Sequence, residues 1–115
     1  MVGTMIREPI RTLVRGLRDG TIRAEALLEE ANGSYWASES LLGAFKTWNR
    51  DFALAQAKAA DALFAAGIDL GLLQGIPVSV KDLYGVEGLP TFAGAKRQLP
   101  ATFSQEGTVV KSLRH

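Results

Sequence analysis

The sequence contains no cysteine and a single histidine, His115, at its last position. Without cysteine, disulfide bridges, thiolate zinc sites, iron–sulfur ligation and cysteine nucleophiles are excluded within these 115 residues. One histidine is too few for a histidine-based metal site or for a catalytic triad built on histidine. The residue types present therefore imply no metal and no organic cofactor.

Long apolar runs and an excess of one charge are also missing. The longest compact apolar stretches, Ala62–Ala66 and Ile76–Val80, are far shorter than the roughly 18–20 residues that a membrane span requires. Thirteen Lys+Arg against twelve Asp+Glu leave a net charge of +1. This balance gives no reason to expect a nucleic-acid or membrane surface, and we expect a cytoplasmic protein.

The first twenty residues are rich in arginine, which rules out the apolar core of a secretory signal peptide. The stretch resembles an organelle presequence, but its apolar residues recur at helical spacing, which favours an ordinary amphipathic helix. The basic face is then a solvated helix side, with RNA or anionic lipid as alternative partners. Arg7, Arg11, Arg15 and Arg18 form the basic face, and Ile6, Ile10, Leu13, Val14 and Leu17 form the apolar one.

The chain has the length of one small domain or of a piece of a larger one, and its 47% hydrophobic content is ordinary for a globular protein. We predict a helix that ends at Asp19-Gly20 and a second helix with Thr21 as its N-cap, which Asn32-Gly33-Ser34 would end or interrupt. An alanine-rich helix should follow, with Asn49 or Asp51 as its cap and Gly67 as its terminator. A last helix is predicted over residues 106–115.

Two strands are predicted, a weak one at Leu42–Trp48 and a clear one at Ile76–Val80. The second is rich in valine without alternation, which is typical of a buried parallel strand. Such a strand needs neighbours for its backbone hydrogen bonds, and the last helix stops without a cap. We therefore expect an α/β fold, helix-rich in this segment, in which residues 1–115 are the truncated N-terminal part of one domain.

Lys81 is the main candidate for chemistry, because it stands at the carboxyl end of the predicted buried strand, where open α/β sheets place their sites. A lysine that is partly desolvated there can act as a general base. The alternative is a structural lysine that reaches solvent or pairs with Asp82. Ser79 would point to the same side of the strand as Lys81, and the two could form a catalytic Ser–Lys pair within this chain. A position as a small residue that faces the core fits Ser79 better.

The residues around Lys81 form a recognisable pattern. Gly75-Ile76-Pro77-Val78-Ser79-Val80-Lys81-Asp82 is followed by Gly88-Leu89-Pro90-Thr91 and by Ala93-Gly94. This arrangement resembles the N-terminal part of the amidase signature family, and weaker helical similarities extend over nearly the whole chain. The resemblance implies helices packed on a mixed sheet and an amidohydrolase that cleaves a linear carbon–nitrogen amide bond of a small molecule.

By that resemblance, the site is a Ser–cis-Ser–Lys triad and Lys81 is its lysine. The lysine exchanges a proton with a bridging serine, which activates the serine that attacks the amide carbonyl. No serine of this chain matches either serine position of the family, and the resemblance places both further along the sequence. We therefore expect these 115 residues alone to be inactive.

Three positions depart from the family pattern: Leu83 stands where a polar residue is common, Gly85 where an acidic one is frequent, and Ala95 where a serine is frequent. These departures leave the substrate open. An amidotransferase-type glutaminase that feeds ammonia to a partner is an alternative function. A non-catalytic helical module that binds a partner is another. Trp36, Trp48 and the phenylalanines suit core or subunit contacts, and a homodimer is compatible with them.

Overall fold

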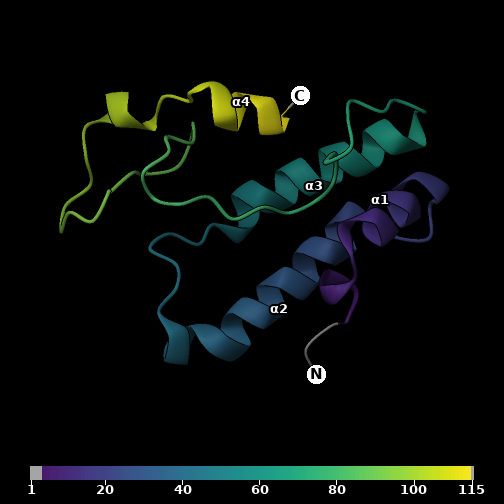
Figure 1. Cartoon of the computed structure of the whole chain (residues 1–115), viewed down its shortest axis with the longest axis horizontal. Coiled ribbons are helices and arrows are strands. Elements are labelled where there is room, and N and C mark those ends of the chain that lie inside the picture. Colours follow the sequence, from purple (N-terminus) through teal and green to yellow (C-terminus); the bar gives the residue numbers. More distant parts are fainter. Residues whose placement is uncertain (1–3, 115) are drawn as a thin grey trace. The chain divides into compact units, whose positions relative to one another are not determined.

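The computed structural model describes residues 4–114 and is helical throughout its regular parts. The helices are α1 (Ile10–Asp19), α2 (Ala24–Leu42), α3 (Arg50–Ala65) and α4 (Thr108–Arg114), with short 3-10 turns η1 (Met5–Arg7) and η2 (Ala101–Ser104) (Figure 1). The described residues divide into two compact units. The first comprises residues 4–44 and 49–77, and the second comprises 45–48 and 78–114.

The predicted first helix is present as α1. Leu13 and Leu17 lie on its buried side, as the apolar spacing predicted. Gly20 ends the helix in the left-handed conformation, with φ of 82°. Gly16, which weakens a helix by propensity, has a packing reason here: an added Cβ would lie 2.5 Å from Cδ1 of Ile22, so only glycine fits beneath that side chain.

The second helix differs from the prediction at both ends. Thr21 is not its N-cap, because α2 begins after Arg23 and the Thr21 hydroxyl bonds to Asp19 instead. The first N–H groups of α2 are satisfied from another helix, since the Asp61 carboxylate accepts from Ala24 N at 2.7 Å and from Glu25 N at 3.1 Å.

The predicted break in the second helix does not occur, and α2 continues through Gly33 to Leu42. A glycine inside a helix costs only about 1 kcal/mol, which the residues on both sides offset by their own helical bonds and packing. Gly43 then ends α2 in the left-handed conformation, and its N–H donates to the Glu39 carbonyl.

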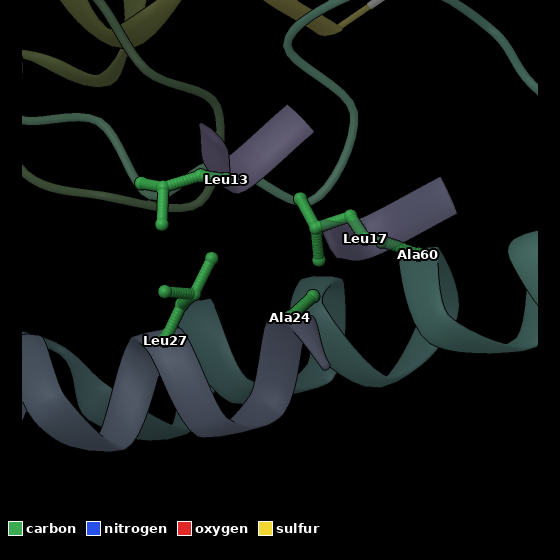
Figure 2. Packing of buried hydrophobic residues seen from close by; sticks show 5 residues of the cluster. All are labelled: Leu13, Leu17, Ala24, Leu27 and Ala60. Atoms are coloured by element: carbon green, nitrogen blue, oxygen red, sulfur yellow. The ribbon is translucent and has the colours of Figure 1, made fainter. Parts of the chain in front are cut away.

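The alanine-rich helix is confirmed as α3. Asn49 caps it as predicted, since its side-chain oxygen accepts from Phe52 N at 2.9 Å, and Gly67 follows its end with φ of 74°. The small side chains let α3 pack along α2 (Figure 1). Figure 2 shows the resulting core, in which Leu13 and Leu17 of α1 meet Ala24 and Leu27 of α2 and Ala60 of α3.

Both strand predictions are wrong for the described residues, none of which forms a strand. Residues 76–80 have no ladder partner there, and a lone segment cannot make the backbone bonds that define a sheet. At 42–48, α2 takes up Leu42, and Phe45 and Trp48 instead pack edge to face with ring centroids 4.9 Å apart. The helix-rich character of the chain is confirmed, whereas its sheet stays a prediction. Among the described helices, none has the length and apolar character needed to cross a membrane.

Candidate functional site

The motif that contains Lys81 begins in the helical unit. Gly75 adopts φ of 82°, and a Cβ at this position would lie 3.2–3.3 Å from Phe64, Ala24 and Leu17. The positive φ favours glycine, and any larger residue would also push these three neighbours slightly outwards. Ile76 follows and packs against the helical core. The motif continues in the second unit from Val78 onwards.

Lys81 opens a turn of the second unit. Its carbonyl accepts from Leu83 N at 2.7 Å and from Tyr84 N at 3.0 Å. The side chain of Lys81 is exposed, and within residues 4–114 it makes no hydrogen bond or ion pair. The predicted partial desolvation of this lysine is therefore not found, because residues 76–80 carry no neighbouring strand that would cover it.

Asp82 does not pair with Lys81, and its carboxylate binds backbone instead. One oxygen accepts from Phe92 N at 3.0 Å and the other accepts from Ala93 N at 3.2 Å. Asp82 therefore holds the loop through two backbone bonds. The carboxylate ties the residue next to Lys81 to a segment ten residues further along the chain.

The segment held by Asp82 is a tight turn. Ala95 N donates to the Phe92 carbonyl at 2.9 Å, and the central residues Ala93 and Gly94 have φ of 50° and 82°. Two positive φ values are the mark of a type I′ turn. Gly94 adopts this conformation freely, whereas Ala93 is the one non-glycine residue among those described with positive φ. The turn thus explains why glycine stands at position 94 in the Ala93-Gly94 pair.

Behind this turn lies a compact hydroxyl network. Thr91 is buried, and its Oγ1 lies 3.2 Å from Oγ of Ser104, which donates to the Leu89 carbonyl at 2.9 Å. The backbone of 103–105 also passes very close to Gly85, where an added Cβ would lie 2.3 Å from the Gln105 oxygen. This contact explains the departure at Gly85, since a larger residue there would displace the 103–105 backbone.

Glu106 is a second anchor, which sequence reasoning missed. Its carboxylate is bound by the Arg114 guanidinium, with Nη2 at 2.7 Å, and accepts from Glu87 N at 3.0 Å. The Arg114 hydrogen bond holds the pKa of Glu106 below its ordinary value. Glu106 lies just before α4 and Arg114 is its last residue, so the ion pair spans the whole helix and leaves little signal in the sequence. An open hollow of about 510 Å³ adjoins Glu106, and Lys81 is not among the residues that line it.

Ser79 does not join Lys81 in a site. Both side chains are exposed, so the core-facing position predicted for Ser79 is wrong in this structure. No hydrogen bond connects the two side chains among the described residues. In the same residues, no group of three or more histidine, aspartate or glutamate side chains is arranged to hold a metal ion.

Comparisons with known proteins give one consistent result. The family model described as Amidase matches residues 26–115. The 2-amino-5-chloromuconic acid deaminase of Comamonas testosteroni is 44% identical over 98 residues, which cover 85% of this chain and 21% of the relative. The AtzE subunit of the 1-carboxybiuret hydrolase of Pseudomonas sp. (strain ADP) is 37% identical over 90 residues, covering 76% of this chain and 20% of the relative.

A third type of relative is a glutamyl-tRNA(Gln) amidotransferase subunit from Anaeromyxobacter dehalogenans (strain 2CP-C). It is 38% identical over 92 residues, which cover 80% of this chain and 19% of the relative. The chain thus spans about a fifth of the length of these curated relatives. No solved structure gives a significant match. Because the family model covers most of the chain, including the Lys81 motif, the chain belongs to the amidase family.

Proposed function

We propose that this chain is the N-terminal part of a larger amidase domain and supplies Lys81 as the acid–base lysine of a Ser–cis-Ser–Lys triad. The observation that carries the proposal is the match of the family model over residues 26–115, which includes the complete Gly75–Asp82 run. Lys81 is compatible with this role, because its side chain makes no hydrogen bond or ion pair within residues 4–114 that would occupy it.

The larger domain is supported by apolar side chains near Lys81 that this chain leaves exposed. Val78 and Leu83 are 54% and 61% exposed, although a soluble domain usually buries such residues when they gather in one segment. Further chain that covers this segment would also desolvate Lys81. The reaction would then follow the order of nucleophilic catalysis: a serine attacks the amide carbonyl, the amine leaves with a proton, and water releases the acyl group.

The test is ammonia release by the full-length protein from a panel of propionamide, benzamide, glutamine and biuret. We expect Lys81→Ala to lower kcat by about 10²–10⁴-fold, the usual contribution of a positioned acid–base group. Lys58→Ala is the matched control, because Lys58 is an exposed lysine of α3 in the other unit. A kcat of Lys81→Ala close to that of the wild type would refute the assignment.

A glutaminase that serves an amidotransferase is the second candidate function. Several relatives are named as subunits of glutamyl-tRNA(Gln) amidotransferases, with identities of 33–38%. This branch predicts that glutamine is the preferred amide of the panel and that hydrolysis depends on ATP and on a partner protein. Rapid hydrolysis of another amide by the protein alone favours the amidohydrolase branch.

A further inference from the structure

The carboxylate of Asp82 holds the backbone next to Lys81. Both oxygens are engaged by main-chain N–H groups, Phe92 N at 3.0 Å and Ala93 N at 3.2 Å. Asp82 follows Lys81 directly, and the Lys81 carbonyl closes the turn onto Leu83 and Tyr84. The backbone at Lys81 is thus held by the hydrogen bonds of its own turn and by the two bonds of the Asp82 carboxylate, which we call the carboxylate clamp.

The other end of this clamp is a strained residue. Ala93 adopts φ of 50°, a left-handed conformation that residues other than glycine adopt rarely and at a cost in free energy. The hydrogen bond from Ala93 N to Asp82 helps to hold this conformation. Strained backbone persists where surrounding contacts over-determine it, and such positions gather at functional sites. Here the strain lies at the point that fixes the peptide next to Lys81.

We propose that Asp82 is a positioning residue for Lys81. Its carboxylate ties the Lys81–Asp82 peptide to the 92–95 turn and thereby fixes the direction in which the lysine side chain leaves the backbone. Asp82 touches no reacting atom in this role. The inference rests on the proposed catalytic function of Lys81, and it matters because a displacement of about 1 Å in a catalytic group can cost roughly 10²-fold in rate.

The test compares Asp82→Asn and Asp82→Ala in the full-length protein, with the amide of the panel that the wild type hydrolyses fastest. Asparagine keeps one acceptor oxygen but turns an NH₂ group towards a backbone N–H, and alanine removes both acceptors. We expect kcat to fall about 10-fold for Asp82→Asn and more for Asp82→Ala, with KM changed by less than about 3-fold. The assays are run well below the thermal unfolding midpoint of each variant. A lower kcat then reflects a displaced Lys81 and not an unfolded protein.

A second-site variant sharpens the test. Ala93→Gly removes the strain at position 93, since glycine adopts positive φ without cost. The turn then forms without help from Asp82, but no carboxylate ties it to the Lys81–Asp82 peptide. Asp82→Ala combined with Ala93→Gly should therefore stay as slow as Asp82→Ala alone. If Asp82→Ala does not fold, the same comparison is made between Asp82→Asn with and without Ala93→Gly.

Asp69→Asn is the matched control. Asp69 also accepts from a backbone N–H, that of Gly71 at 3.1 Å, but it lies in the helical unit and binds Arg18. Its substitution should leave kcat unchanged. Three results overturn the positioning role while Lys81→Ala stays at least about 10²-fold slower than the wild type: wild-type kcat in Asp82→Asn, a loss confined to KM, or recovery of Asp82→Ala by Ala93→Gly. Full activity of Lys81→Ala overturns the proposed function instead.

Discussion

Two leucines of α2 contribute very differently to stability although they belong to one helix. Leu27 is 0% exposed and points into the core towards Leu13 of α1 (Figure 2). Leu41 is 89% exposed near the end of the same helix. Helix propensity is the same for both, so burial decides the difference.

We expect Leu27→Ala to lower the free energy of unfolding by about 2–5 kcal/mol, because it removes buried methyl groups and leaves a cavity. Leu41→Ala should change it by less than about 0.5 kcal/mol. Urea unfolding followed by circular dichroism measures both. Equal losses in the two variants would contradict the core described here.

Gly85 is required for a different reason, which is space. Gly85→Ala would place a Cβ 2.3 Å from the Gln105 oxygen and 2.6 Å from the Phe103 oxygen, and backbone must move to accommodate it. We expect a loss of about 1–3 kcal/mol, read from the thermal unfolding midpoint. Gly107→Ala is the control, since a Cβ there meets nothing within 4 Å. A Gly85→Ala variant as stable as the control would refute the close approach.

At the scale of elements, the sequence predicted what local chemistry decides. The Asn49 cap, the Gly20 and Gly67 ends and the apolar side of α1 all follow from residues within a turn of the feature. The start of α2 could not be predicted in this way, because its capping carboxylate comes from α3. The strand at 76–80 was predicted from side-chain pattern, but a strand exists only if a partner pairs with it.

For the candidate site, the sequence predicted the main residue but not the contacts around it. The motif singled out Lys81, since this assignment follows from the order of residues. The strained turn at Ala93 and the Glu106–Arg114 anchor were missed. Positive φ at Ala93 and an ion pair that spans the whole of α4 depend on the folded backbone, and neither has a strong sequence signal.

The α2 cap gives a prediction for this element. Asp61→Asn should weaken the bonds to Ala24 N and Glu25 N and lower stability by about 1 kcal/mol, and Asp61→Ala by up to about 2 kcal/mol. Amide hydrogen exchange at residues 24 and 25 should accelerate in both variants. Asp51→Asn serves as the control, because Asp51 is 94% exposed and far from these amides in sequence. Unchanged exchange in the Asp61 variants would show that α2 is capped otherwise.

At the scale of the whole molecule, three carboxylates link stability to pH. The pKa of Glu106 is lowered by its Arg114 hydrogen bond, that of Asp69 by its Arg18 hydrogen bond, and that of Asp19 by its Thr21 hydrogen bonds. A lowered pKa means that the folded state prefers the charged form. The stabilising contribution is therefore complete above the ordinary pKa and disappears as the pH falls through the folded-state pKa.

We expect the free energy of unfolding to be nearly constant from pH 7 to about pH 5 and to decrease below about pH 4. Urea unfolding across this range measures it. Glu106→Gln should reduce the slope on the acidic side, and Arg114→Gln should do the same, since either change removes the pair. A slope unaffected by both variants would show that this pair does not contribute to the acid sensitivity.

The cap of α2 by Asp61 also has a consequence for the order in which the chain becomes structured during synthesis. The acceptor lies 37 residues after the first amide that it binds. A ribosome that adds about 5–20 residues per second needs roughly 2–7 s to make this stretch. During that interval, the first turn of α2 is hydrated and free to fray. The nascent chain therefore acquires its final α2 boundary only when α3 has been translated and has docked.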